Sequence, residues 1–584
     1  MDFPDHVELA IIGAGWNGLA MAKTYLECHP NAKLIVLDKG TSIGGVWAKD
    51  RLYPHLKSNN VKGNLEYSDF PMDLERFGVK PGEHIPGATV HEYLFQYSKE
   101  FGIYSKIRLG AVVGVIERSL TGGWTLNVQS GKDSVQHQLH ADKVVFATGL
   151  TSEAWMPDFH GLENYACPVY HVKDLAHNTD QLYQTARNVT VIGGTKSGWD
   201  AAYTCANAGI HVDMIVRKSG HGPAWMSWPK VTPFKMYLEK LVHTRFLTWF
   251  SPCIWGDFDG FSWIRKFLHG TRIGRFFVDS FWTILNNDLL QGGKYDNHSE
   301  TKKLKPWISP FWIASSLSIF NYDTDFFELV RNGKINVHIE DVSGFAEKSV
   351  QLSSGATLSS DALICATGWK HRPPVKFLPS DIEREIGLPK RPSSEDEELA
   401  HVADKRILDQ FPRLRNQPNS NPEYKPMDGS EPAVELHPYR LYRFMVPPAF
   451  ADDRNIAFMG AMQSISTAMI AQVQALWLTA YLDGTLDLET ETWNDRAQGE
   501  PTLAEKIVQE TYLDSQFGKW RCPGGYGNQF PDIVFDCLPY IDMLLRQLGL
   551  SYHRKRNLIA EVFDSYSTSD YRGLVDEWRT KVGK

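Results

Sequence analysis

The sequence has 584 residues, of which 42% are hydrophobic and 22% charged, a composition typical of a globular protein with two to four compact units. Its formal net charge of −8 argues against general binding to nucleic acid. The seven cysteines are scattered and form no C-x-x-C pair. This pattern disfavours a metal site and a disulfide framework, and it favours a reducing compartment.

The amino-terminal residues 1–10 are acidic and lead directly into a strand pattern, so we expect no signal peptide and a cytoplasmic protein. No run of 18 apolar residues predicts a membrane span. The nearest candidate, Phe246–Trp255, is short and is interrupted by Pro252. It predicts a buried helix end, and a peripheral membrane contact remains an open alternative.

The first motif in chain order is a glycine-rich turn. Val7–Ile12 is an apolar, β-branched run typical of a buried parallel strand. Gly13, Gly15 and Gly18 follow with G-x-G-x-x-G spacing, which gives a tight turn, a close approach to a pyrophosphate and close helix–strand packing. A second strand pattern ends at Asp38, where a carboxylate can accept a hydrogen bond from a ribose hydroxyl. The combination predicts a dinucleotide site rather than a structural glycine turn.

The segment after this turn narrows the class of dinucleotide enzyme. Gly44 and Gly45 again permit close approach of the backbone to a ligand. A redox-active disulfide here would indicate a disulfide reductase, but Trp47 stands in this segment and no cysteine is near. We therefore disfavour that class and place Gly45 and Trp47 in the cofactor site.

A second strand–turn–helix pattern, VTVIGGTKSGWDAA, has Gly193, Thr195 and Gly198 at the fingerprint positions. Thr195 departs from the usual glycine, so we expect its side chain to point away from the phosphates or the turn to open slightly. Lys196 and Ser197 would compensate by supplying a cation and a hydroxyl.

The strand after the second turn ends in two cations, Arg217 and Lys218. Arg217 follows Gly193 at nearly the same offset at which Asp38 follows Gly13. A guanidinium can grip a 2′-phosphate that an acid would repel. The first turn therefore predicts an adenosine with a free ribose, and the second predicts NADPH. The alternative for Arg217 is a surface cation at a strand end.

With these two turns, the sequence resembles the class B flavoprotein monooxygenases, a family that holds flavin-containing monooxygenases, N-hydroxylases and Baeyer–Villiger enzymes. The resemblance covers residues 7 to about 485. The stretch YPHLKSNNVKGNLEYSDFP resembles a flavin-containing monooxygenase pattern, and its matching residues are Tyr53, Asn59, Lys62, Asp69, Phe70 and Pro71.

Three further segments carry the resemblance. Lys143–Pro157 and Asp361–Lys370 are similar to the two ATG hinges of the family, with Thr148 and Thr367 as their threonines. Asn455–Trp477 resembles the segment that returns to the flavin and closes its site. The resemblance therefore implies FAD and NADPH as cofactors.

The identifying motif of the family, F-x-G-x-x-x-H-x-x-x-(Y/F/W), is kept only in part. His171 is present, whereas Tyr165, Cys167 and Leu175 replace the phenylalanine, the glycine and the closing aromatic residue. Baeyer–Villiger enzymes commonly have Trp at the last position and Asp where Asn59 stands, so both departures favour the other branches. His171 is a candidate proton donor, although a structural hydrogen-bonding role in the linker is the favoured interpretation.

We expect an α/β fold with two Rossmann-like dinucleotide-binding domains, helical insertions and a helical carboxy-terminal extension. The resemblance implies a discontinuous FAD domain, residues 1–175 and 371–499, around an inserted NADPH domain, residues 176–370. Helical spacing predicts an insertion at about 223–310, which would be a small helical subdomain or a substrate cap. Polar composition predicts a surface insertion or lid at about 380–438, and residues 500–584 form the extension.

The resemblance implies a monooxygenase that inserts one oxygen atom from O₂ into a lipophilic small molecule through a peroxyflavin. Asn59 would stabilise that adduct; its alternative role is an Asx turn in SNN. N- or S-oxygenation is favoured over Baeyer–Villiger oxidation of a ketone. A nucleotide-binding pseudoenzyme acting through partner contacts and an uncoupled NADPH oxidase remain the alternatives of other classes. The sequence does not indicate the oligomeric state.

Overall fold

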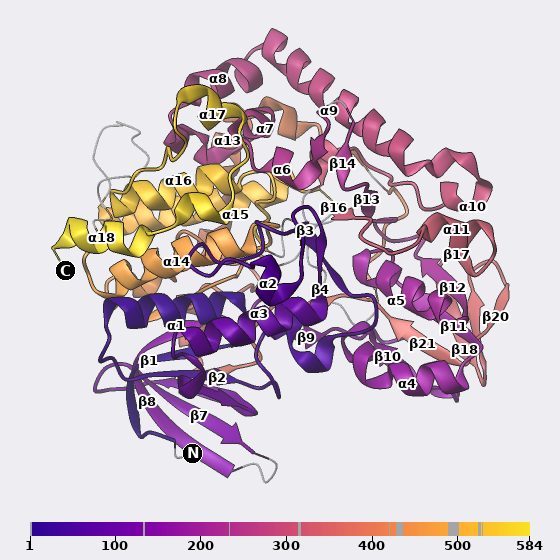
Figure 1. Cartoon of the computed structure of the whole chain (residues 1–584), viewed down its shortest axis with the longest axis horizontal. Coiled ribbons are helices and arrows are strands. Elements are labelled where there is room, and N and C mark those ends of the chain that lie inside the picture. The colour runs from indigo at the N-terminus through magenta and orange to yellow at the C-terminus, as the bar shows by residue number, and fades with distance from the viewer. Residues whose placement is uncertain are drawn as a thin grey trace.

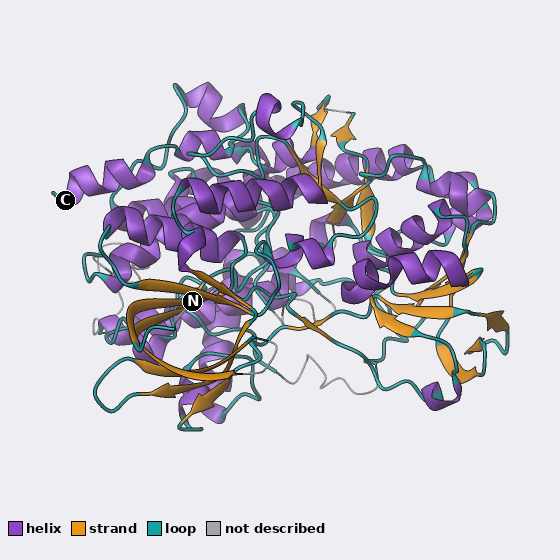
Figure 2. Cartoon of the chain, turned by 60° about the horizontal axis from the view of Figure 1, so that its bottom comes forward, coloured by secondary structure: helices purple, strands orange, loops and turns teal. Residues whose placement is uncertain are grey.

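The computed structural model describes residues 3–131, 135–232, 234–313, 317–419, 421–427, 436–486, 488, 502–523, 527 and 530–583. Two β-sheets lie side by side along one edge of the molecule, and most of the helices form a layer above them (Figures 1 and 2). The expected α/β class with two Rossmann-like units, helical insertions and a helical extension is confirmed. The predicted boundary between residues 499 and 500 lies outside the described residues.

The first sheet combines a parallel core with an antiparallel meander. Its strands lie in the order β23 (Lys376–Leu378), β6 (Ala111–Arg118), β7 (Trp124–Ser130), β8 (Val135–Phe146), β1 (His6–Ile12), β2 (Leu34–Asp38) and β5 (Ile107–Leu109), with β24 (Ile456–Phe458) also beside β8. The two strand patterns predicted around the first glycine turn are confirmed as β1 and β2. Strands β23 and β24 arrive from far later in the chain, so distant segments complete this sheet.

Helices explain why the central strands are apolar throughout. On one face of β1 lie α1 (Trp16–Cys28) and α14 (Thr467–Leu482), which pack against each other, while α3 (Gly87–Glu100) packs nearby. The opposite face has its own apolar cluster, which includes Val7, Ala10 and Ile12. A parallel strand buried on both faces needs a continuous apolar run rather than an alternating one.

The second sheet is fully parallel. Its order is β10 (Val169–His171), β21 (Ala362–Cys365), β11 (Asn188–Ile192), β12 (His211–Val216) and β17 (Ile335–Ile339). It packs against α5 (Lys196–Asn207), α4 (Leu175–Thr185) and α11 (Phe326–Arg331). Strand β10 pairs with this sheet although it precedes residue 175, and a small antiparallel sheet of β18 (Val342–Ala346), β19 (Ser349–Leu352) and β20 (Thr357–Ser359) follows β17.

The helical layer joins three separate stretches of chain. The insertion contributes β13 (Trp225–Ser227), β14 (Lys230–Val231), β15 (Met236–Tyr237), α6 (Leu238–Val242), α7 (Arg245–Phe250), α8 (Ser262–Gly270), α9 (Arg272–Gly293) and α10 (Ser299–Lys302), and β16 (Leu317–Ile319) pairs with β13. The carboxy-terminal stretch contributes α15 (Leu503–Arg521), α16 (Cys537–Leu548), α17 (Leu558–Phe563) and α18 (Leu574–Val582). The expected burial of Phe246–Trp255 is confirmed at Leu247, Ile254 and Trp255.

The polar stretch expected at 380–438 holds regular structure. Its helices are α12 (Ile382–Glu385) and α13 (Ser394–Gln410). Ser393 and Asp396 form a capping box that starts α13, and α13 packs against α15 of the extension. Within the described residues, no helix is long and apolar enough to cross a membrane, and all seven cysteines are free thiols.

One buried cation ties the insertion to the extension. Arg245, at the start of α7, forms ion pairs with Asp542 of α16 and Glu561 of α17, and all three side chains are buried. Arg245 Nη2 also donates to the carbonyl oxygen of Tyr552 at 3.1 Å. Because removing one partner of a buried ion pair leaves uncompensated charge, this contact locks the two stretches together.

We predict that Arg245→Met lowers the free energy of unfolding by about 3–5 kcal/mol, because two carboxylates stay buried without their cation. Arg331→Met, which breaks the partly exposed pair of Arg331 with Asp325, is the control and should cost less than about 1 kcal/mol. Urea titration of both variants measures the difference. Equal losses in the two variants would contradict the proposed lock.

Candidate functional site

The first glycine turn joins β1 to α1 at the carboxyl edge of the first sheet. Gly13 has a φ of +113°, and a Cβ there would overlap the carbonyl oxygen of Ala147. A Cβ at Gly18 would overlap the carbonyl oxygen of Gly13. Gly15 is the N-cap of α1, without a side-chain cap, so the first N–H groups of the helix are available to an anion.

A second pair of glycines lies against this turn. Gly44 and Gly45 have φ values of +114° and +62°, and the Gly44 N–H donates to the Ala14 carbonyl at 2.9 Å. A Cβ on Gly45 would lie 3.4 Å from Gly15 Cα. The two turns are therefore in direct backbone contact, and the N-terminus of α1 is bordered by glycine backbone, which fits close approach of a pyrophosphate such as that of FAD.

Asp38 ends β2 beside the first glycine turn. Its carboxylate accepts hydrogen bonds from the Ala14 N–H at 2.6 Å and the Gly40 N–H at 2.7 Å. Burial raises the pKa of Asp38, and the two backbone donors oppose that rise. Trp47 follows in the same loop, and its carbonyl accepts a hydrogen bond from His91 Nδ1 at 3.1 Å.

The second glycine turn repeats the geometry of the first. Gly193 has a φ of +141°, and a Cβ there would overlap the Ala366 carbonyl oxygen, while a Cβ at Gly198 would overlap the Gly193 carbonyl oxygen. Thr195 is the N-cap of α5 with φ −85° and ψ 173°, close to the −88° and −168° of Gly15. Because this is extended backbone, threonine adopts it without strain, and its side chain is exposed.

Lys196 does not stand as an unpaired cation beside the second turn. It forms an ion pair with Asp200 one turn along α5, and its ammonium lies 4.6 Å from the centre of the Tyr322 ring. Asp200 also accepts hydrogen bonds from the Tyr53 hydroxyl at 3.0 Å and the Tyr322 hydroxyl at 2.9 Å. Ser197 is half-buried and makes no hydrogen bond through its hydroxyl in the described part of the chain.

The cations after β12 contact a segment of the polar insertion. Arg217 Nη2 donates to the Lys425 carbonyl at 3.1 Å, and Lys218 forms an exposed ion pair with Glu423 at 3.1 Å. Asn421 Nδ2 donates to two carbonyls of the same loop, at 2.8 and 2.7 Å. Residues 421–427 therefore lie against the loop that was predicted to receive a 2′-phosphate.

The two ATG segments run side by side after they leave their sheets. Short strands β9 (Glu153–Ala154) and β22 (Trp369–Lys370) pair antiparallel. Thr367 Oγ1 donates to the Trp155 carbonyl at 2.7 Å, which crosses from one linker to the other. Thr148 is half-buried directly after Ala147. The paired linkers hold the carboxyl edges of the two sheets together.

His171 contributes to this joint. Its Nε2 donates to the Gly368 carbonyl at 3.0 Å, and its Nδ1 accepts from the Lys173 N–H at 3.1 Å. The ring is buried, and burial lowers the pKa of His171. Both nitrogens are engaged with backbone, an arrangement that fits a structural role better than proton donation.

Asn59 lies in a strand rather than in an Asx turn. Strand β3 (Lys57–Val61) pairs with β4 (His84–Pro86). Asn321 Nδ2 donates to the carbonyls of Lys57 and Ser58 at 3.1 and 3.0 Å, and it lies 3.5 Å from Asn59 Oδ1. Asn59 Nδ2 donates no hydrogen bond to another described residue, so one neutral donor of this side chain is available.

A buried carboxyl holds the residues that follow Asn59. Glu239 of α6 accepts hydrogen bonds from Asn60 Nδ2 at 2.5 Å and from the Val61 N–H at 2.8 Å. Asn60 Nδ2 also donates to the Ile465 carbonyl at 2.7 Å. Burial raises the pKa of Glu239 to about 7, although these donors favour its charged form.

Sequence reasoning missed Asn60, Glu239, Asn321 and Asp200. The doubled asparagine in SNN was a local signal for Asn60. Glu239 and Asn321 are about 180 and 260 residues from β3 in the sequence and carry no motif, so only the fold brings them to it. Asp200 stands within the second glycine-turn motif, but its contact with Tyr53 depends on the fold. The segment Asn455–Trp477 does reach this region, since the Met459 N–H donates to the Phe146 carbonyl and Ile465 contacts Asn60.

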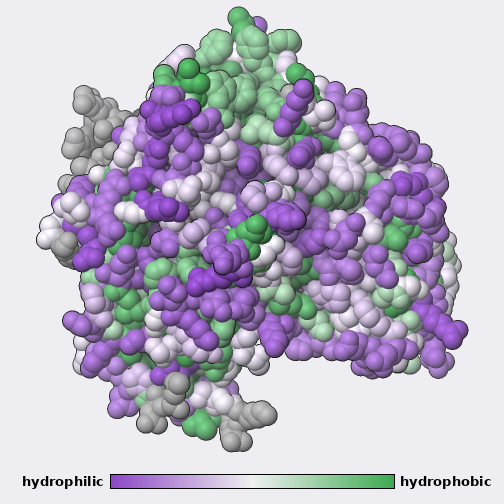
Figure 3. Space-filling view, viewed as in Figure 1, coloured by the Kyte–Doolittle hydropathy of each residue, from purple (hydrophilic) through white to green (hydrophobic). Residues whose placement is uncertain are grey.

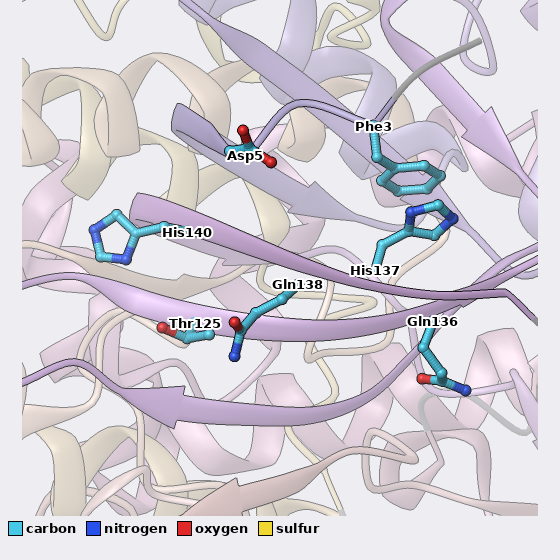
Figure 4. A pocket seen from close by; sticks show the side chains of 7 residues that line it. All are labelled: Phe3, Asp5, Thr125, Gln136, His137, Gln138 and His140. Atoms are coloured by element: carbon cyan, nitrogen blue, oxygen red, sulfur yellow. The ribbon is translucent and has the colours of Figure 1, made fainter.

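A polar hollow of about 500 Å³ lies elsewhere, against the outer part of β7 and β8 (Figure 4). Figure 4 shows the stacked rings of Phe3 and His137 at one side of it. His6, His140 and Asp142 form a partly exposed cluster next to it. Both features lie near the amino end of β1, whereas the glycine turns lie at the carboxyl edge where open α/β sheets bind ligands.

Comparison with known proteins identifies the family. The profile of the pyridine nucleotide-disulphide oxidoreductase family matches residues 10–238. The chain is 34% identical to the FAD-dependent monooxygenase resA of Aspergillus sclerotiorum over 98% of both chains.

Solved structures show the same fold. Cyclohexanone monooxygenase from Rhodococcus sp. Phi1, bound to NADP⁺, matches with a TM-score of 0.58 at 15% identity over 94% of this chain and 98% of that one. S-allyl-L-cysteine S-oxygenase from Allium sativum matches with a TM-score of 0.53 at 15% identity over 99% and 94%. The sequence relative, at 34% identity over nearly the whole chain, favours an enzyme over a nucleotide-binding pseudoenzyme. The chain is a flavin-dependent monooxygenase and belongs to the class B flavoprotein monooxygenases.

Proposed function

We propose that this monooxygenase uses FAD and NADPH to insert one oxygen atom of O₂ into a lipophilic small molecule, and that it prefers a nitrogen or sulfur atom as acceptor. When bound, the flavin supplies the redox chemistry, taking hydride from NADPH and activating O₂. The observation that carries the preference is the neutral amide of Asn59, whose Nδ2 donates no hydrogen bond to another described residue and would face the reacting groups.

The binding roles follow from the two turns. Residues proposed for FAD are Gly13, Gly15, Gly18, Asp38, Gly45, Trp47 and Thr148, and those proposed for NADPH are Gly193, Thr195, Lys196, Ser197, Gly198, Arg217, Lys218 and Thr367. The four-part domain division at residues 175, 370 and 499 belongs to the same proposal. Lys196 would contact a phosphate only if its ion pair with Asp200 opened, because Asp200 holds its ammonium and offsets its charge.

Asn59 would hold the oxygen species by hydrogen bonding. Its amide can donate through Nδ2, which has no acceptor among the described residues, while Asn321 restrains its Oδ1 side. An amide cannot remove a proton at neutral pH, so this position keeps the transferred oxygen electrophilic. Electrophilic oxygen reacts with the lone pair of an amine or a thioether rather than with a carbonyl carbon.

Aromatic packing of the insertion supports a lipophilic substrate. The rings of Phe234, Phe246 and Phe281 lie 6.0 to 6.5 Å from one another. Helix α6, which carries Glu239 to β3, lies between Phe234 and Phe246 in the sequence. An apolar wall beside a few polar groups is the usual form of a small-molecule site.

One observation favours the alternative, Baeyer–Villiger oxidation of a ketone. Position 59 has no carboxylate. Glu239 nevertheless places a carboxylate against the next two residues of β3, where it accepts hydrogen bonds from Asn60 and Val61. With a pKa raised to about 7 by burial, it loses its proton as the pH rises through neutrality. The resulting negative charge would favour nucleophilic oxygen.

We predict that Arg217→Ala raises the KM for NADPH roughly 10- to 100-fold and leaves the KM for NADH nearly unchanged, because a charge-assisted hydrogen bond to the 2′-phosphate is lost. Lys218→Ala is the matched control, with a smaller effect expected because Lys218 is exposed and already paired with Glu423. Steady-state NADPH and NADH oxidation measures both. Equal effects of Arg217→Ala on the two nucleotides would refute the 2′-phosphate role.

We predict that a thioether and a tertiary amine each gain one oxygen atom in the presence of enzyme, NADPH and O₂, and that Glu239→Gln retains this activity. Product mass spectrometry and oxygen consumption measure it. A ketone should give little ester at any pH. If ester forms, and its rate rises through about pH 7 in the wild type but stays flat in Glu239→Gln, the Baeyer–Villiger alternative holds instead. Complete recovery of hydrogen peroxide with every substrate would contradict both.

A further inference from the structure

The insertion and the extension together expose a large apolar surface, which we call the α8–α9–α17 face. Figure 3 shows it as the hydrophobic cap at the top of the molecule, where Figure 1 places α8, α9 and α17. Its exposed side chains are Trp263 and Phe267 of α8, Ile273, Phe276, Phe277 and Ile284 of α9, and Leu558, Ile559 and Phe563 of α17. Contiguous apolar surfaces of this kind mark contact with another apolar phase.

Helix α9 carries two apolar stripes, and only one is used by the core. Val278, Trp282 and Leu285 face inward and are buried. Ile273, Phe276 and Phe277, spaced as neighbours on another side of the same helix, face outward, and Phe276 is 67% exposed. A surface helix normally has polar residues on its outer face, so the outer stripe has no explanation within the fold.

The three helices form one continuous face. Helix α8 packs against α9, and α17 packs against α7. Phe563 of α17 lies 5.5 Å from Phe246 of α7, measured between ring centres, and Phe246 lies 6.1 Å from Phe281 of α9. Arg245 fixes α7 to α17 through its buried pair with Glu561. The exposed groups are therefore held together by a rigid scaffold.

The charges around this face are mainly positive, in contrast to the net charge of −8 for the chain. Between residues 262 and 286 the sequence has four basic residues, Arg265, Lys266, Arg272 and Arg275, against a single acid, Asp279. Arg265 is buried and paired with Asp259, so it adds no charge to the surface, and Asp564 after α17 is the exposed acid nearest to the face in the sequence. Asp279 is neutralised by an ion pair with Arg413. Lys266, Arg272 and Arg556 are exposed, and none of them pairs with a carboxylate in the described part of the chain.

We propose that the α8–α9–α17 face docks on the surface of a membrane that contains anionic phospholipids. The aromatic and aliphatic side chains enter the boundary between headgroups and acyl chains, and Lys266, Arg272 and Arg556 contact the phosphates. A tryptophan such as Trp263, which is 70% exposed, is the residue type that favours this interface. The helices lie in the plane of the membrane, and the two nucleotide turns stay on the side of the molecule away from it.

Vesicle flotation with the purified full-length protein tests this proposal. Vesicles of phosphatidylcholine alone are compared with vesicles containing phosphatidylserine, at low and high salt. We expect at least tenfold more protein on the anionic vesicles, loss of binding in the triple variant Trp263→Ser/Phe276→Ser/Phe277→Ser, and weaker binding in Lys266→Glu/Arg272→Glu. The matched control is Val112→Ser/Leu120→Ser/Val135→Ser, which removes exposed apolar residues from β6, from β8 and from the turn between β6 and β7, and it should bind like the wild type.

Two further measurements keep the outcome decisive. Circular dichroism and bound-flavin absorbance establish that each variant is folded, so that loss of binding is not loss of structure. Vesicles should shift the tryptophan emission of the wild type to shorter wavelength, and Trp263→Phe should reduce that shift. Absence of vesicle binding, or equal binding by the triple variant, overturns the proposal. So does light scattering that shows a wild-type dimer converted to a monomer by the triple variant, since a second copy would then cover the face.

Discussion

Two backbone contacts set the geometry on which the rest of the molecule depends. At Gly13 and at Gly193, the first residue of a glycine turn touches the carbonyl of the alanine in an ATG segment, Ala147 or Ala366, so closely that no side chain fits between them. The backbone at both glycines has positive φ, which glycine adopts without penalty. Each contact places a helix N-terminus at the carboxyl edge of its sheet, which is the position proposed to receive a phosphate.

The same two contacts relate the sheets to each other. The ATG segments that close the glycine turns continue into β9 and β22, which pair with each other. Thr367 and His171 add hydrogen bonds across this joint. The carboxyl edges of both sheets, and hence both proposed dinucleotide sites, therefore meet at a ribbon whose position is fixed by local backbone packing. Hydride transfer between two cofactors needs such a fixed distance.

The sequence predicted the parts of the site that are local in the chain. Strand, glycine turn, helix start and terminal acid lie within about 30 residues, the span of one βα unit, so their spacing alone defines their geometry. Threonine at position 195 is tolerated in place of the usual glycine because its φ and ψ are close to those of Gly15.

The contacts made over long separations in the chain could not be predicted. Lys196 was expected to be available to phosphate, but it pairs with Asp200 four residues along α5. That pair is local, whereas Tyr53 and Tyr322, which hold the Asp200 carboxylate, come from distant segments. Arg217 was predicted from its offset, whereas its contact with Lys425 depends on a segment about 200 residues away. Composition described 380–438 as a surface stretch and did not reveal α13, because a solvated helix and a polar loop share the same residue types.

Glu239 shows how the insertion is coupled to β3, the strand that carries Asn59. Burial of a carboxyl group is unfavourable, and its raised pKa is the measure of that cost. An apolar residue at this place would instead leave the Asn60 amide and the Val61 N–H buried with fewer acceptors, at about 1–3 kcal/mol for each unsatisfied group. The Glu239 carboxyl therefore offsets its own burial cost by accepting hydrogen bonds from donors on β3 that find no acceptor in the sheet of β3 and β4. By accepting these hydrogen bonds, α6 fixes β3, the strand that carries Asn59. A movement of the insertion would therefore shift Asn59 as well.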